Sequence, residues 1–252
     1  MSDPLLSLRD VGRSFGALAA VDGVDLDVAA GTLHALIGPN GAGKTTLVNL
    51  IDGALKADRG QIRFAGRPIV HLPDHARARL GLARTYQITS IFPASSVRDN
   101  VLVAVVAASG RTWRMWRPMV RDTAACDRAM ALLADVGLAE HAERPAGTLA
   151  HGQQRQLEIA MALAAAPRLL LLDEPMAGMG PEESADMVER LRDLKTRHTI
   201  LLVEHDMDAV FALADVVTVL VSGRVLMTGA PDDVRTDEGV RQAYLGTGED
   251  AA

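Results

Sequence analysis

The sequence predicts an α/β protein with a helical segment inserted into its core. Three short apolar runs, His34–Ile37, Leu169–Leu172 and Thr199–Val203, are typical of strands in a sheet that is covered on both faces. Between about residues 88 and 164 the pattern favours helices and contains no clear strand. A chain of 252 residues is long enough for one large domain, or for a core that carries an inserted subdomain.

The part of the chain before this segment is expected to be rich in strands. A short strand at Leu5–Leu8 precedes a loop at Arg13–Gly16. Residues Val24–Val28 and Gln61–Phe64 alternate polar and apolar side chains, as antiparallel strands with one wet face do. A short helix over Pro73–Leu80 follows, because proline is tolerated at a helix start.

The helical segment begins with a capping signal. A strand over Leu82–Tyr86 leads into it, and Ser96 and Asp99 then form a capping box in front of an apolar run. A second helix is expected over about Arg121–Val136, closed by Gly137.

The core resumes after this segment and ends in a hairpin. A helix is expected to start at Pro181 and to run to about Arg197. Val216–Val221 and Val225–Thr228 are two strands joined by a Ser-Gly turn, which predicts a β-hairpin. The last twenty-odd residues look like two short helices and an acidic end.

Composition excludes several classes of protein. The net charge of −6 and the 3% aromatic content argue against a nucleic-acid binder, which needs a basic face and stacking platforms. The single cysteine, Cys126, excludes an internal disulfide and favours a reducing cytosol. The N-terminus lacks the pattern of a signal peptide, and no apolar run approaches the roughly 20 residues that span a bilayer. Any membrane role is therefore expected to come through a partner.

One stretch predicts a phosphate-binding loop. It fits the pattern G-x-x-x-x-G-K-[ST] and lies between the apolar run His34–Ile37 and a helical start at Leu47–Ile51. Glycines let the backbone fold around a phosphate, and the N–H groups and the helix N-terminus face the anion. Lys44 would reach the β- and γ-phosphates, and the Thr45 hydroxyl would lie on Mg²⁺. The alternative is a glycine-rich turn that binds nothing. The residues of the stretch are Gly38, Pro39, Asn40, Gly41, Ala42, Gly43, Lys44, Thr45 and Thr46.

Polar residues at strand ends extend the candidate site. Asp173 and Glu174 follow an apolar strand, at the end where open α/β sheets bind ligands. Asp173 would hold Mg²⁺ through water, and Glu174 would orient or deprotonate an attacking water. Gln87 ends the strand before the helical segment and would sense both Mg²⁺ and that water. The alternatives are a strand-end turn with two solvated acids and a glutamine on the surface.

Three further features complete the constellation. A glycine-bearing stretch precedes an apolar-periodic helix and offers a second anion site at the helix N-terminus. His205 follows the strand Thr199–Val203 and would donate to a γ-phosphate oxygen; the alternative is a structural histidine. Phe15 would stack on adenine, although a loop phenylalanine is as often part of a core. The second anion site comprises Leu149, Ala150, His151, Gly152 and Gln153.

These motifs, in this order, resemble the ATP-binding subunits of ABC transporters. The resemblance runs from Phe15 to Gly246, and its motifs are specific as a combination. It implies a RecA-like core with a small antiparallel β subdomain and an inserted helical subdomain. It also implies a head-to-tail dimer, in which each ATP lies between one subunit's phosphate loop and the other's signature, residues Leu149–Gln153. The expected divisions are 1–87 (N-terminal core), 88–164 (helical subdomain with the signature), 165–230 (C-terminal core) and 231–252 (short helices and tail).

A finer resemblance points to importers of branched-chain amino acids and related amides such as urea. It rests on Gly81–Gln87, Ile91-Phe92, Gln154–Ala160 and Val240–Gly246. The subgroup usually pairs two different ATP subunits. It implies transmembrane permease subunits and a separate substrate-binding protein as partners, and a place on the cytoplasmic face of the inner membrane.

The sequence departs from the family pattern at two positions, and other kinds of ABC ATPase are alternatives. Ala150 stands where the family has a serine, and Gly180 stands where it has an aspartate; the subgroup is tolerant at both positions. A lipopolysaccharide exporter has a similar tail, but the stretch Ala83–Gln87 argues against it. A soluble ABC ATPase of DNA repair, chromosome maintenance or translation would carry long insertions or two ATPase units. The basic segment Arg111–Arg117 is read either as a contact with lipid headgroups or a partner, or as a surface helix.

Overall fold

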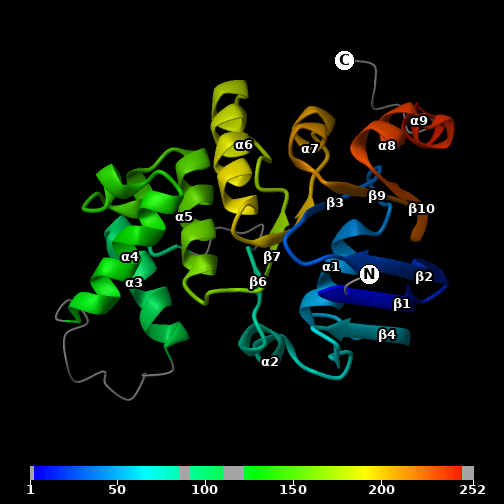
Figure 1. Cartoon of the computed structure of the whole chain (residues 1–252), viewed down its shortest axis with the longest axis horizontal. Helices are drawn as coiled ribbons and strands as arrows, with labels where there is room; N and C mark the ends of the chain where they lie inside the picture. Colours follow the sequence, from blue (N-terminus) through cyan, green and yellow to red (C-terminus); the bar gives the residue numbers. More distant parts are fainter. Residues whose placement is uncertain (1–2, 86–90, 110–121, 246–252) are drawn as a thin grey trace.

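A six-stranded sheet forms the centre of the molecule, in a computed structural model that describes residues 3–85, 91–109 and 122–245 (Figure 1). Its strand order is β10-β9-β3-β8-β7-β6, and all neighbours are parallel except the antiparallel pair β9–β10. The strands are β3 (Leu33–Ile37), β6 (Leu82–Arg84), β7 (Leu169–Asp173), β8 (Thr199–Val203), β9 (Val216–Val221) and β10 (Arg224–Gly229).

The central strands are buried on both faces, as their continuous apolar sequences predict. Alternate residues of one strand enter different cores, because successive side chains point to opposite faces. In β7, Leu169 and Leu171 pack with the N-terminal sheet and helix α1 (Lys44–Asp52), whereas Leu170 and Leu172 pack with the inserted helices. The sheet is therefore sandwiched between two apolar layers.

A second, four-stranded antiparallel sheet has the order β2-β1-β4-β5. Its strands are β1 (Leu6–Phe15), β2 (Leu18–Val28), β4 (Arg59–Phe64) and β5 (Arg67–Pro68). The predicted loop at Arg13–Gly16 is wrong over its first three residues, because β1 continues to Phe15 and pairs there with Leu18. The end of this strand has mostly exposed side chains and a shifted register, so no apolar alternation marks it in the sequence.

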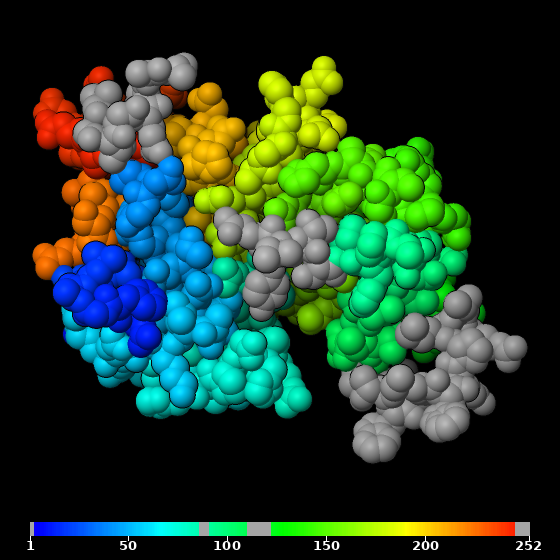
Figure 2. Space-filling model, turned by 180° about the vertical axis from the view of Figure 1, so that it is seen from behind, coloured from blue at the N-terminus to red at the C-terminus, as the bar shows by residue number. Residues whose placement is uncertain are grey.

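Helices pack around the sheets, and two groups of them can be followed in Figure 1. Helices α3, α4 and α5 form a lobe at one end of the molecule, and α7, α8 and α9 pack beside β9 and β10. Figure 2 shows the green helical lobe set apart from the blue and cyan strand-rich lobe by a notch at the lower edge of the view. The helices are α1 (Lys44–Asp52), α2 (Asp74–Arg79), α3 (Val97–Ala108), α4 (Thr123–Asp135), α5 (His151–Leu163), α6 (Pro181–Lys195), α7 (Met207–Leu213), α8 (Pro231–Thr236) and α9 (Glu238–Leu245).

Local capping signals place several of these helices correctly. The Ser96 hydroxyl accepts the backbone N–H of Asp99 at 3.0 Å and so caps α3. Pro181 is the first residue of α6, as predicted. Gly137 follows α4 with a φ of 78°, the left-handed conformation that favours glycine.

Within the described residues, no helix has both the length and the apolar character needed to cross a bilayer.

A buried histidine in β3 predicts that the fold loses stability in mild acid. His34 is 1% exposed, its Nε2 lies 2.8 Å from Thr218 Oγ1, and burial lowers its pKa to about 4. Because the unfolded side chain titrates near 6.5, the unfolded state binds more protons between these two pKa values. The contribution of His34 to the free energy of unfolding is at its full value above about pH 6.5. It falls as the pH drops, by about 2 kcal/mol between about pH 7.5 and pH 5.

Urea unfolding at these two pH values measures this loss. His34→Gln keeps a polar side chain and cannot titrate, so its stability is expected to change less with pH. The difference between the two proteins isolates His34 from other titrating groups. An equal change with pH in both proteins would contradict the prediction.

Candidate active site

The predicted site lies at one edge of the six-stranded sheet, where four neighbouring strands end. The strands β3, β8, β7 and β6 are parallel neighbours, so their carboxyl ends lie together. The phosphate loop follows β3, His205 comes two residues after β8, and Glu174 follows β7. Gln87 comes three residues after β6 in the sequence and lies outside the described residues.

The phosphate loop has the strand–loop–helix setting that the motif requires, with α1 starting at Lys44. Two of its glycines are demanded by close backbone approaches. A Cβ at Gly38 would lie 2.0 Å from the carbonyl oxygen of Leu220, and one at Gly43 would lie 2.3 Å from that of Ala20. Both residues also have left-handed φ values, 153° and 102°. The path of the loop therefore depends on strands β2 and β9.

Lys44 is buried inside its own loop. Its side chain donates to the carbonyl oxygen of Gly38 and, at 3.1 Å, to that of Pro39. The ammonium is thus held against the first residues of the loop, and the N-terminus of α1, which starts at Lys44, favours an anion. The next residue, Thr45, is exposed at the first turn of α1.

The turn of the β9–β10 hairpin is hydrogen-bonded to the phosphate loop. Ser222 and Gly223 both have positive φ values, 47° and 78°, as a two-residue hairpin turn of type I′ requires. The Gly223 N–H donates to the carbonyl oxygen of Ala42 at 2.8 Å, and its own carbonyl accepts from the Asp22 N–H at 2.8 Å. This turn therefore ties the loop to strand β2.

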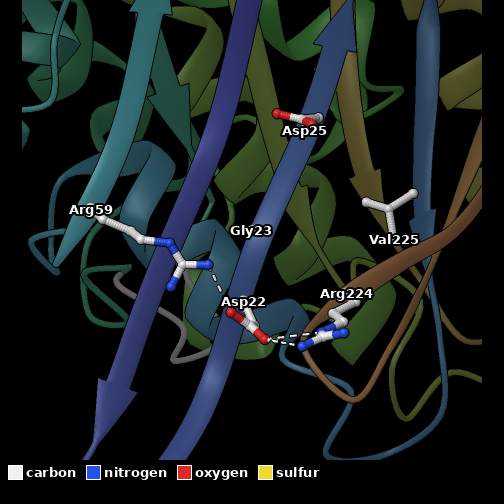
Figure 3. Close-up of a pocket in the computed structure, with 6 residues that line it drawn as sticks. All are labelled: Asp22, Gly23, Asp25, Arg59, Arg224 and Val225. Atoms are coloured by element: carbon white, nitrogen blue, oxygen red, sulfur yellow. Dashed lines mark hydrogen bonds and ion pairs between the residues drawn. The ribbon is translucent and has the colours of Figure 1, made fainter.

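An ion-pair cluster fixes the same hairpin to the antiparallel sheet (Figure 3). Asp22 accepts from Arg59 at 2.7 Å and from Arg224 Nη2 at 2.6 Å, and these hydrogen bonds lower its pKa. The cluster lines a shallow surface pocket that contains none of the predicted nucleotide-site residues. Exposed ion pairs contribute little stability singly, so we assign the cluster to orienting the turn.

Asp173 has the surroundings of a metal ligand. It is 3% exposed, and its Oδ2 accepts from Arg84 Nη2 at 2.8 Å. Its Oδ1 is buried and has no hydrogen-bond partner within the described residues. A buried carboxylate oxygen that is left unpaired costs free energy unless a cation or a water satisfies it. Asp173 and Thr45 therefore fit a Mg²⁺ ion, which typically binds one or two protein oxygens together with phosphates and waters.

Within the same described residues, no group of three or more histidine, cysteine, aspartate or glutamate side chains is placed to hold a metal ion.

Glu174 adopts a conformation that is rare for its residue type. Its φ is 49°, in the left-handed region, and its N–H donates to the carbonyl oxygen of Val203 at 2.9 Å. Non-glycine residues with such φ values cost free energy and cluster at functional sites. The side chain is half-buried at the carboxyl end of β7.

A buried carboxylate that sequence reasoning missed joins two parts of this edge. Glu204 is fully buried between β8 and His205, and its side chain accepts the N–H of Met176 at 2.9 Å and that of His205 at 3.0 Å. Burial raises its pKa, although these N–H groups favour the charged form. An acid at the end of an apolar strand is the signal that could have identified it. The imidazole of His205, by contrast, is 61% exposed, with Nδ1 3.6 Å from Glu204.

The structure places the signature away from the chain's own phosphate loop. It forms the start of α5, and strands β6 and β7 lie between α5 and α1 in Figure 1. Ala150 is the N-cap residue, and its N–H donates to Gln153 Oε1 at 3.2 Å. Ala150 and His151 are exposed, whereas Gly152 is buried. The helix N-terminus is therefore open to another molecule.

Phe15 is the last residue of β1, which pairs with the strand β2 that approaches the phosphate loop. Its side chain is 47% exposed, and the Arg13 guanidinium carbon lies 5.1 Å from the centre of its ring. Its partner Leu18 is on β2, two residues before Ala20, whose carbonyl approaches Gly43. An exposed aromatic ring at this place is available for stacking and does not belong to the core.

The central sheet, the glycine-rich loop after β3 and the acidic end of β7 define a P-loop nucleotide-binding protein of the α/β class. A sequence profile described as ABC transporter matches residues 21–177. A second profile, described as branched-chain amino acid ATP-binding cassette transporter, matches residues 224–250. The chain belongs to the ABC transporter family, and within that family it is an ATPase subunit.

Relatives with known names cover the whole chain. The high-affinity branched-chain amino acid transport ATP-binding protein LivG of Salmonella typhimurium is 40% identical over 253 residues, which is 98% of this chain and 99% of LivG. The protein of the same description from Pseudomonas aeruginosa, BraF, is 40% identical over 256 residues, with the same coverage. These similarities confirm the predicted resemblance.

Solved structures confirm the predicted fold class. An ATP-binding cassette of an ABC transporter in its ADP conformation has a TM-score of 0.87 to this chain at 29% identity, and the match covers 97% of this chain and 100% of that one. A nucleotide-free cassette has a TM-score of 0.84 at 29% identity, over 95% and 98% of the two chains.

Proposed function

We propose that this chain powers an importer of branched-chain amino acids or of related small amides by binding and hydrolysing ATP. The observation that carries the proposal is the 40% identity, over nearly the full length, to proteins described as branched-chain amino acid transport ATP-binding proteins. The match of the C-terminal residues 224–250 to a profile of the same description supports it independently.

Residues at the edge of the six-stranded sheet, together with Phe15 of β1, divide the work on ATP between them. Phe15 stacks on adenine, and the loop residues from Gly38 to Thr46 surround the phosphates, with Lys44 on the β- and γ-phosphates. Glu174 accepts a proton from the attacking water or orients it, and His205 donates to a γ-phosphate oxygen. These assignments are supported by the common strand edge and by the exposure of Phe15, Thr45 and His205.

The side chains of Asp173 and Thr45 would hold Mg²⁺, with Gln87 as a further ligand. The ion would neutralise charge that develops on the phosphates. Within the chain itself, the buried carboxylate of Asp173 is kept in place by Arg84, and the exposed residue Thr45 stands at the first turn of α1.

A second ATP-binding subunit would complete each site. Ala150 and His151 of the signature are exposed at the start of α5, on the other side of β6 and β7 from α1, so they are available to an ATP held by another subunit. ATP would then close a head-to-tail dimer of identical or different subunits, and hydrolysis would reopen it. Permease subunits would carry this motion across the inner membrane at its cytoplasmic face, and a separate binding protein would present the substrate.

Co-expression with permease subunits of a branched-chain amino acid importer from the same organism tests the proposal. We expect the chain to co-purify with them, and the ATPase activity of the reconstituted complex to rise when a binding protein loaded with a branched-chain amino acid is added. Stimulation by an unrelated substrate class, or ATPase activity that never responds to permease subunits, would contradict it.

The absent serine at Ala150 leads to a prediction about closure. A hydroxyl at this N-cap would donate to the γ-phosphate held by the partner subunit, and a hydrogen bond to a charged group contributes about 1.5–3 kcal/mol. Ala150→Ser is therefore expected to lower the ATP concentration for dimerisation about tenfold. The assay is ATP-dependent dimerisation in a Glu174→Gln background. A homodimer responds at both sites, and a heterodimer at one.

Helix capping must be separated from phosphate binding in this experiment. A serine at an N-cap also stabilises its own helix, by about 0.5–2 kcal/mol. Ala230 is the uncapped N-cap residue of α8, so Ala230→Ser provides the matched control. An unchanged ATP midpoint in Ala150→Ser, or an equal shift in both variants, would show that the new hydroxyl does not meet the phosphate.

A further inference from the structure

Arg84 joins three segments of the nucleotide site through one buried guanidinium. Its Nη1 donates to Asn49 Oδ1 at 2.7 Å and to the carboxylate of Asp52, and its Nη2 donates to Asp173 Oδ2 at 2.8 Å. The side chains of Arg84, Asp52 and Asp173 are 7%, 4% and 2% exposed. One cation therefore connects the end of α1, the helix that begins at Lys44, to the acidic end of β7.

The backbone of Arg84 is fixed as firmly as its side chain. It is the last residue of β6, and it pairs in parallel register with Leu171 of β7. The next residue, Thr85, donates its N–H to the carbonyl oxygen of Leu171 at 3.0 Å. A guanidinium presents its donors in a rigid planar fork, which an ammonium cannot reproduce. The position of the fork is thus set by the sheet and not by a flexible loop.

We propose that Arg84 is a positioning residue for the Mg²⁺ ion of the nucleotide site, an inference that rests on the proposed function. By holding Oδ2 of Asp173, it leaves the buried Oδ1 as the oxygen that faces a cation. By holding Asn49 and Asp52 with the same guanidinium, it fixes this carboxylate relative to the helix that carries Lys44 and Thr45. The distance between the phosphate loop and the carboxylate of Asp173 then stays the same when ATP binds.

The charge balance explains why an arginine serves here better than a neutral side chain. The guanidinium supplies a positive charge to the buried carboxylates of Asp52 and Asp173, and Arg77 acts electrostatically on Asp52 as well. Without Arg84, Oδ2 of Asp173 would lose the cation that pairs with it in a dry environment. Partners that orient a metal ligand typically change metal affinity about 10- to 100-fold when they are removed.

Arg77 offers a matched control, because it also lies beside helix α1. It is also a buried arginine that packs on α1, but its guanidinium donates to the backbone carbonyl oxygens of Leu50, Ile51, Val70 and Leu72. None of these hydrogen bonds involves a carboxylate. Arg77→Lys therefore removes a comparable set of buried hydrogen bonds, while it keeps the positive charge that acts on Asp52 and does not touch the Arg84–Asp173 hydrogen bond.

The test is the Mg²⁺ dependence of nucleotide binding in the purified full-length chain. A fluorescent ATP analogue is titrated in EDTA and at increasing Mg²⁺ concentrations, and thermal melting is recorded for each protein. Arg84→Lys is expected to bind the analogue in EDTA as the parent does, but to need about tenfold more Mg²⁺ for the metal-dependent gain in affinity. Arg77→Lys is expected to melt at a lower temperature and to keep the parental Mg²⁺ requirement.

Several outcomes would overturn the inference. It fails if Arg84→Lys has the parental Mg²⁺ requirement, or if Arg77→Lys shifts that requirement equally. If Arg84→Lys does not fold, Asp52→Asn decides, because it cuts the connection to α1 and is expected to raise the Mg²⁺ requirement as well; a parental value there refutes the proposal. A parent that binds no nucleotide at all would instead refute the proposed function.

Discussion

Lys44→Ala is expected to remove most of the nucleotide affinity of this chain. The ammonium lies inside the loop, where water is largely excluded, and each charged hydrogen bond to a phosphate contributes about 1.5–3 kcal/mol. Loss of one such contact weakens binding about ten- to a hundredfold. The carbonyl oxygens of Gly38 and Pro39 also lose their partner, so the loop itself becomes less well ordered.

Calorimetric titration with ATP measures this loss directly. Lys56 is an exposed lysine shortly after α1, and Lys56→Ala removes the same charge outside the loop. That variant is expected to bind ATP as the parent does. Equal ATP affinity of Lys44→Ala and the parent would exclude the assigned role of the loop.

Glu174→Gln is expected to bind ATP and to hydrolyse it about 10²- to 10⁴-fold more slowly. The amide keeps the shape of the side chain and cannot accept a proton from water. The left-handed backbone at this position is set by its surroundings, because the Glu174 N–H is bonded to Val203, so glutamine is expected to occupy the same place. The variant should therefore accumulate the ATP-bound closed dimer.

Phosphate release by the assembled transporter and light scattering of the purified subunit measure the two halves of this prediction. Glu182→Gln, an exposed substitution in the first turn of α6, removes one carboxylate without entering the sheet edge and serves as the control. Unchanged turnover in Glu174→Gln would show that another group activates the water.

Local patterns were sufficient to predict the phosphate loop, the buried strands and the terminal hairpin. The loop is a contiguous motif, and strands such as β7 are recognisable because both of their faces are apolar. The end of β1 was missed for the opposite reason. Its residues Arg13 to Phe15 are largely exposed, and the strand is held there by backbone pairing with β2, which has no signature in side-chain polarity.

The sequence did not reveal Arg84 and Glu204, because their importance lies in partners that are distant along the chain. Arg84 contacts residues on α1 and β7, and Glu204 accepts a hydrogen bond from Met176. Each is a charged residue at the end of a short apolar strand, which by itself is as typical of a surface turn. Only the order of strands in the sheet shows that both ends lie at the nucleotide edge.

The position of β3 in the sheet has a consequence for how the protein is made. This strand feeds the phosphate loop, yet its sheet neighbours are β8 and β9, and the turn after β9 holds Ala42. A nascent chain emerges from the ribosome N-terminus first, so the motif is synthesised long before the strands that shape it. We therefore expect the loop to take its folded shape only after β8 and β9 have been synthesised, with the apolar strand β3 unpaired until then.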